Sequence, residues 1–269
     1  MKYMTFNSSC SYAGLANLLD FYGIDTEDRE IALQMRLPYL FACQDGGYLA
    51  GPMLQGAAWF DLYLNPLGFK LEERILGKDE VCAELRDNAP AMLGLRVSPE
   101  GKHAVIYTGC NGGKYRFLNN KRKGPPEMET LELSEKDLLA SLDEETVVGR
   151  LERTDPVPID YRPYLEQSVL VFRELQEKIA AYCGVEQSAP SLRQAMDSLF
   201  RPVLLDGVTM LELLGETEIA GALKEIRAQF LRVIRAERPA VLERALDMPR
   251  LQAALHQYEE LILRRMEAE

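Results

Sequence analysis

The sequence places a cysteine at the start of a predicted helix and a histidine at the start of a predicted strand. Cys10 opens the run 10–22, in which apolar residues recur at helical spacing before Gly23. A helix N-terminus presents unpaired N–H groups and the positive end of the dipole, and both favour a thiolate. His103 begins the β-like run 103–109. An imidazole beside Cys10 would activate it for attack on an acyl carbonyl.

A predicted hairpin could supply the third member of such a site. Asn111-Gly112-Gly113 separates the run 103–109 from the run 114–119, and these residues tolerate the positive φ of tight turns. Residues that face one another across an antiparallel pair lie on the same side of the sheet. A side-chain amide near the end of the second strand can therefore accept the imidazole N–H and fix its tautomer. A strict two-residue turn at Asn111-Gly112 would place Asn120 opposite His103, so both Asn119 and Asn120 are candidates.

Composition excludes several classes of protein. The net charge of −11 over 269 residues argues against a nucleic-acid partner, because phosphate binding needs a basic face. Neither a membrane-spanning apolar run nor a signal-peptide core is present, so we expect a cytoplasmic protein without a membrane partner. The five scattered cysteines lack C-x-x-C spacing and the chain has two histidines, so neither a disulfide framework nor a metal site is expected. No glycine-rich nucleotide motif is present, and we expect no cofactor.

The periodicity of apolar residues changes along the chain, and Asp155-Pro156-Val157-Pro158 marks a boundary. The first part has helical runs at 10–22, 52–64 and 78–87, with a loop at 44–48, followed by short β-like runs at 91–97, 103–109, 114–119, 129–133 and 146–152. The second part has only helical patterns, at 160–183, 189–200, 208–235, 239–247 and 249–267. We therefore predict an α+β fold, with a mixed domain at 1–154 and an all-α helical domain at 155–269.

In their order, these segments resemble the papain-like cysteine enzymes, in particular the branch that removes double-glycine leader peptides from bacteriocins. The matching pieces are 9–23, 56–58, 67–69, 87–90 and 102–109. In that family an Asp or Asn follows the histidine by sixteen positions, which here is Asn119. The resemblance covers the first 150 residues or so and implies a papain-like domain with Cys10, His103 and Asn119 as a triad, Asn120 being the alternative third member.

One position departs from the papain-like pattern. Those peptidases place a glutamine six residues before the cysteine as an oxyanion donor, but this chain has Met4 there, which cannot donate. Asn7 or Ser8 would then have to assist the Cys10 N–H; one such donor is typically worth about 2.7–4 kcal/mol. The start of the chain also resembles the N-terminal domain of the butirosin-pathway acyltransferase family, which moves an acyl group from a carrier-protein thioester to an amine.

Three functions are compatible with this pattern. The first is cysteine-dependent acyl transfer from a thioester to an amine, or a related thiol hydrolysis, with a carrier-protein thioester as the acyl donor. The second is peptide cleavage of the leader-peptidase type. The third is a catalytically inert protein of the same fold that binds a peptide or a partner. Met4 disfavours peptide cleavage and favours the inert protein, whereas the joint presence of Cys10, His103 and Asn119 favours an enzyme.

Overall fold

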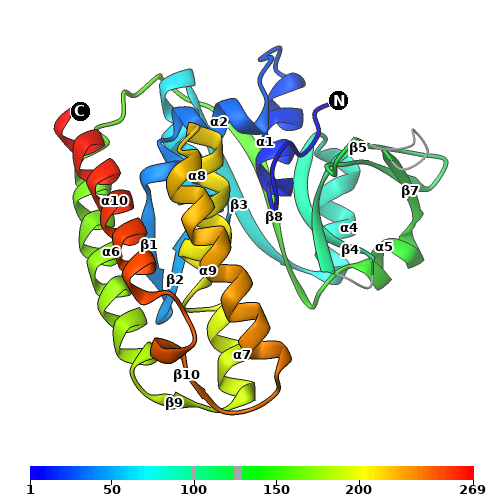
Figure 1. Cartoon of the computed structure of the whole chain (residues 1–269). Coiled ribbons are helices and arrows are strands. Elements are labelled where there is room, and N and C mark those ends of the chain that lie inside the picture. The colour runs from blue at the N-terminus through cyan, green and yellow to red at the C-terminus, as the bar shows by residue number, and fades with distance from the viewer. Residues whose placement is uncertain (99–100, 124–128) are drawn as a thin grey trace. The chain divides into compact units, whose positions relative to one another are not determined.

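The computed structural model describes residues 1–98, 101–123 and 129–269, which form two compact units (Figure 1). The first unit comprises Met1–Met35 and Gln55–Ile159, and the second comprises Arg36–Leu54 and Asp160–Glu269. The second unit therefore includes a segment from the N-terminal part of the chain. From the sequence we expected two contiguous domains, 1–154 and 155–269. That expectation did not include this excursion of the chain, Arg36–Leu54, into the second unit.

A six-stranded antiparallel sheet forms the centre of the first unit, in the order β3-β8-β4-β5-β6-β7. Its strands are β3 (Phe69–Gly77), β4 (Ala91–Ser98), β5 (Gly101–Asn111), β6 (Lys114–Asn119), β7 (Thr130–Ser134) and β8 (Glu145–Arg153). Five of them confirm β-like runs of the sequence. The sixth, β3, was not predicted, because its exposed charged stretch Glu72-Glu73-Arg74 interrupts the alternation of apolar and polar residues.

Helices cover both faces of this sheet. They are α1 (Cys10–Asp20), α2 (Asp28–Gln34), α3 (Ala57–Leu64), α4 (Lys78–Asp87) and α5 (Glu135–Ser141). On one face, buried side chains of α4 and α5 share a core with β4 and β5, including Leu93 and Val105. On the other face α1 approaches so closely that a Cβ on Gly14 would lie 2.9 Å from Met92 Sδ. Successive strand residues point to opposite faces, so the neighbours Met92 and Leu93 serve the two helical layers.

The second unit is mainly helical, as expected. Its helices are α6 (Arg162–Cys183), α7 (Ala189–Asp197), the π-helical turn Pro202–Gly207, α8 (Val208–Leu214), α9 (Thr217–Arg235) and α10 (Met248–Glu267). The predicted helix 208–235 is divided at Gly215, which adopts φ +82° and ends α8. The predicted helix 239–247 is wrong: it contains β10 (Ala240–Val241), which pairs with β9 (Glu186–Gln187), and a 3₁₀ turn.

The excursion of the chain contributes a hairpin to this helical unit. Strands β1 (Phe41–Gln44) and β2 (Gly47–Ala50) pair in antiparallel fashion, so the expected loop 44–48 between two helices is instead the tip of a hairpin. Phe41 packs edge-on against Phe172 of α6 and Tyr258 of α10. Its N–H also donates to Ser168 Oγ at 3.0 Å, which satisfies a buried backbone group.

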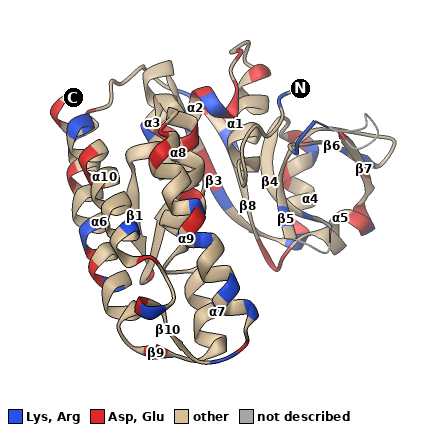
Figure 2. Cartoon of the chain, in the orientation of Figure 1, with Lys and Arg blue, Asp and Glu red and all other residues tan. Residues whose placement is uncertain are grey.

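Acidic and basic side chains are interspersed along α6, α9 and α10 (Figure 2). Arg173 of α6, for example, pairs with Glu259 of α10 at 2.6 Å, and Arg250 of α10 pairs with Glu225 of α9 at the same distance. Among the described residues, no helix combines the length and the apolar character that a membrane span requires.

Candidate functional site

Cys10 and His103 line the same pocket of the first unit, with a volume of 250 Å³. The starts of α1 and α3 border this pocket together with strands β3, β4, β5 and β8. Residues on both faces of β5 reach it, since Lys102 and Ala104 line it as well as His103. Cys10 and His103 are both half-buried. The structure therefore brings together the thiol and the imidazole that the sequence places 93 residues apart.

The segment before Cys10 is held by a buried carboxylate that sequence analysis missed. Asp28 lies at the start of α2 and is fully buried. Its two oxygens accept hydrogen bonds from Ser9 Oγ at 2.6 Å, Thr5 Oγ1 at 2.6 Å and the backbone N–H groups of Thr5 and Arg29 at 2.7 and 2.8 Å. These four donors compensate the cost of burying the charge. In the sequence, Asp28 differs in no way from the acidic residues that commonly begin a helix.

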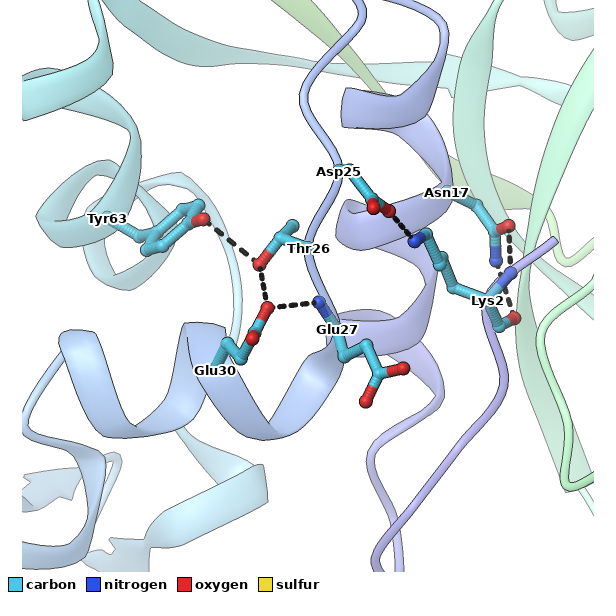
Figure 3. Close-up of polar contacts among 7 residues, drawn as sticks. All are labelled: Lys2, Asn17, Asp25, Thr26, Glu27, Glu30 and Tyr63. Atoms are coloured by element: carbon cyan, nitrogen blue, oxygen red, sulfur yellow. Dashed lines mark hydrogen bonds and ion pairs between the residues drawn. The ribbon is translucent and has the colours of Figure 1, made fainter.

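Three further hydrogen bonds hold the start of α2 (Figure 3). Glu30 accepts from the Glu27 N–H at 3.1 Å and closes a capping box that begins α2. Thr26, just before it, donates to Glu30 at 3.2 Å and accepts from Tyr63 of α3 at 3.2 Å. The start of α2 is thereby tied to α3, whose own start borders the pocket.

The N-terminal segment that precedes α1 is also attached to this helix. Lys2 exchanges two backbone hydrogen bonds with the Asn17 side chain, at 2.7 and 2.8 Å, and its ammonium pairs with Asp25 (Figure 3). The chain between Lys2 and Cys10 is thus attached at both ends, to α1 by Asn17 and to α2 by Asp28. This attachment restricts the positions that Asn7 and Ser8 can adopt beside the pocket.

Asn119 lies on the same face of the sheet as His103. Strands β5 and β6 pair Val105 with Asn119, with a register shift between Tyr107 and Gly109. Since side chains alternate along a strand, His103, Val105 and Asn119 project to one side, with Asn119 diagonal to His103. Asn119 is 4 % exposed. The role of Asn119 as the third member of the site stays a prediction.

Asn120, the alternative candidate from the sequence, has a different environment. Its Oδ1 accepts from Asn17 Nδ2 at 2.9 Å, and its own Nδ2 donates to the Ala104 carbonyl at 3.0 Å. It is fully buried against α1, where a Cβ on Gly14 would lie 2.8 Å from its Nδ2. Its amide therefore connects α1 to the sheet on the opposite side from Val105.

Asn7 and Ser8, the expected oxyanion donors, are close to Cys10 because they precede it in the chain. Asn7 and Ser8 are exposed, and Ser8 adopts φ +61°, a left-handed conformation that side chains rarely favour. Asn7 Oδ1 accepts from the Arg122 guanidinium, which leaves the Asn7 amide group as the donor end of this side chain. Met4 is held through its backbone, whose N–H donates to the Lys121 carbonyl at 3.1 Å.

The remaining titratable candidates lie away from this pocket. Cys43 and Cys110 are exposed on strands, whereas Cys82 and Cys183 are buried. His256 is exposed on α10 and lies 3.3 Å from Glu260. Across the described ranges, no three His, Cys, Asp or Glu side chains gather as metal ligands would.

Comparisons with known proteins add a distant structural likeness. No family model matches this sequence, and no curated protein is significantly similar to it. Among solved structures, the chain is similar to the peptidase domain of Streptococcus ComA, a bi-functional ABC transporter involved in a quorum-sensing pathway. The match has 13% identity and a TM-score of 0.38, and covers 55% of this chain and 96% of the ComA domain. At this distance the function has to be inferred from the pocket itself.

Proposed function

We propose that the first unit is a cysteine-dependent acyltransferase or thiol hydrolase that acts on thioesters. The observation that carries this proposal is the shared pocket of Cys10 and His103 at the start of α1. A nucleophile and a base that meet in one pocket are the minimum requirement for covalent acyl chemistry. The position of Asn119 on the face of His103 supports its role as the third member.

In the proposed reaction, the Cys10 thiolate attacks the carbonyl carbon of the thioester and forms a tetrahedral oxyanion. The oxyanion collapses, the carbon–sulfur bond to the donor breaks, and the departing thiolate takes a proton from His103. An amine or water then attacks the acyl-cysteine while His103 accepts its proton, and Cys10 leaves as the thiolate. Asn119 would accept the second imidazole N–H and keep the ring in one tautomer.

Thioesters are favoured over peptides because of the oxyanion site. The proposed donors are the Cys10 backbone N–H and the amide of Asn7 or the backbone of Ser8, and Met4 adds no side-chain donor. An amide has a poor leaving group and depends strongly on oxyanion stabilisation. A thioester has a good leaving group and tolerates a weaker site. Peptide cleavage of the leader-peptidase type is the second candidate, and it uses the same three residues.

Turnover of small acyl thioesters by the full chain tests the proposal, with release of the free thiol as the signal. We expect turnover that Cys10→Ser abolishes and an acyl-enzyme visible by intact-mass measurement. The exposed Cys110→Ser serves as the matched control and is expected to retain full activity. Efficient cleavage of unactivated peptides without thioester turnover would favour the peptidase. No reaction with either substrate, together with an unreactive Cys10, would favour an inert binding protein.

A further inference from the structure

The pocket of Cys10 contains a carboxylate that the proposed reaction does not use. Glu73 of β3 lines this pocket together with Cys10 and His103. A negative charge near a cysteine nucleophile opposes formation of the thiolate. Its presence therefore requires an explanation other than activation of the nucleophile.

The Glu73 carboxylate is held in a defined place. Its Oε2 accepts from the Ala57 N–H at 2.9 Å, at the first turn of α3. A Cβ on Gly56 would lie 3.4 Å from Oε2, and Gly56 adopts φ +90°, so the backbone passes close to the carboxylate at a position that favours glycine. Across the sheet, Glu73 pairs with Gly149, which also lines the pocket.

This carboxylate also has no cationic partner. Two other acidic residues of the first unit form ion pairs: Glu152 with Lys70 at 2.8 Å, and Glu84 with Arg74 at 2.6 Å. Lys102, the cation that lines the pocket, pairs instead with Asp143. Within the part of the chain that the structure describes, no ion pair engages Glu73. Among the described residues, the pocket thus holds a carboxylate that is not engaged in an ion pair.

We propose that Glu73 is a specificity-determining residue that binds a positively charged group, an ammonium or a guanidinium, on the acyl substrate. This inference rests on the proposed function. The Oε2 atom remains bonded to Ala57, and Oε1 receives the cation, so the hydrogen bond from α3 fixes the direction of the charge. The binding step moves no proton and makes no covalent bond. It selects substrates that carry a cation on the same side of the pocket as β3.

Three thioesters that differ only in side-chain charge test this selection: those of Nα-acetyl-lysine, Nα-acetyl-norleucine and Nα-acetyl-glutamate. For the unmodified chain we expect kcat/KM to fall in that order, with lysine preferred over norleucine by roughly threefold to fivefold, the range of a partly solvated ion pair. The preference should shrink as salt rises, because an exposed charge is screened.

Two variants separate recognition of charge from capping of α3. Glu73→Gln keeps an oxygen that accepts from the Ala57 N–H but removes the charge, so the preference for lysine over norleucine should disappear. Glu72→Gln makes the same change one residue earlier, on the other face of β3, and should keep the preference. An unchanged preference in Glu73→Gln, or no lysine preference in the unmodified chain, would overturn the inference.

Protection of Cys10 from iodoacetamide provides a readout that does not need turnover. Nα-acetyl-lysine amide should slow alkylation of Cys10 more than Nα-acetyl-norleucine amide does, and Glu73→Gln should abolish the difference. If this protection is found without any thioester turnover, the proposed function fails and the cation site stands. If turnover depends on Cys10 but both amides protect equally, the cation site fails and the proposed function stands.

Discussion

Asn17 of α1 and Asn120, which follows β6, are joined side chain to side chain, with Asn17 Nδ2 donating to Asn120 Oδ1 at 2.9 Å. Asn17 also donates to the Ala13 carbonyl, and Asn120 donates to the Ala104 carbonyl, so both amides are saturated by buried partners. This link attaches the helix that begins with Cys10 to the strand that contains His103. It assigns Asn120 a structural task and leaves Asn119 as the candidate that shares a face with His103.

The two asparagines should therefore respond differently to truncation. Asn120→Ala removes the acceptor that Asn120 offers to Asn17 and the donor that it offers to the Ala104 carbonyl, and is expected to lower the free energy of unfolding by roughly 2–4 kcal/mol. Asn119→Ala is expected to lower kcat for thioesters tenfold or more, because the imidazole loses its orienting group. Urea denaturation and steady-state kinetics on both variants distinguish the two roles. A larger loss of kcat in a well-folded Asn120→Ala than in Asn119→Ala would reverse the assignment.

Cys10 is expected to be the most reactive of the five thiols at neutral pH. Burial raises the pKa of Cys82, and it raises the pKa of Cys183 to about 12, so both should react slowly in the folded chain. Cys43 and Cys110 are exposed but do not border the pocket of His103. Alkylation rates for each cysteine, measured by peptide mapping, test this expectation. Faster reaction at Cys43 or Cys110 would remove Cys10 from the role of nucleophile.

Asp28→Asn tests whether the buried carboxylate positions the segment before Cys10. An amide cannot accept all four hydrogen bonds, and its NH₂ group would face donors, so unfolding should become easier by roughly 2–4 kcal/mol. In the fraction that remains folded, the alkylation rate of Cys10 should fall because the bonds that fix Thr5 and Ser9 to α2 are weakened. Asp20→Asn, at the exposed end of α1, should change stability by less than about 0.5 kcal/mol. Equal effects of the two variants would show that Asp28 has no special role.

Met4→Gln tests the alignment of the oxyanion site. If position 4 corresponds to the glutamine of papain-like peptidases, the new amide should stabilise the tetrahedral oxyanion and raise the rate of peptide cleavage tenfold or more. Thioester turnover should change little, since it depends less on this donor. Met4→Leu is the control for the change of side-chain shape. An identical peptide rate in the two variants would contradict the alignment.

Asp206 gives the second unit a pH-dependent stability. It is 5 % exposed, and burial raises its pKa to about 6 despite the ion pair with Arg201 at 3.0 Å. The folded state holds this proton more tightly than the unfolded state. The protonated carboxyl therefore stabilises the folded state fully below the usual pKa of 3.8, and this stabilisation is lost as the pH rises to about 6. The change should be about 2–3 kcal/mol, at about 1.36 kcal/mol per pKa unit.

Denaturation with urea between pH 4 and pH 7 measures this dependence, followed by the signal of the helical unit. Stability should fall more with rising pH in the unmodified chain than in Asp206→Asn, which carries no titratable group there. Asp197→Asn, at the exposed end of α7, is the matched control and should leave the pH dependence unchanged. Parallel pH curves for the unmodified chain and Asp206→Asn would contradict the raised pKa.

Local pattern in the sequence determined much of the first unit. Helical spacing after Cys10, the Asn111-Gly112-Gly113 turn and the alternation along 103–109 and 114–119 each depend on neighbouring residues alone, and the corresponding α1, β5 and β6 confirm them. The α+β class followed from the order of such segments. These features could be predicted because helix and strand periodicity record which side of an element is buried.

Tertiary structure decided the features that depend on distant partners. The hairpin Phe41–Ala50 could not be predicted from its own residues, because they carry no strong strand pattern. It depends on the contacts of Phe41 with α6 and α10. Burial of Asp28 and placement of Glu73 in the pocket of Cys10 likewise depend on segments far away in the chain. Which of Asn119 and Asn120 shares a face with His103 depends on a one-residue register shift between β5 and β6. This shift moves each pairing beyond it by one residue and so exchanges the faces of the two asparagines relative to β5. Sequence periodicity describes which residues are buried, but it does not say which element buries them.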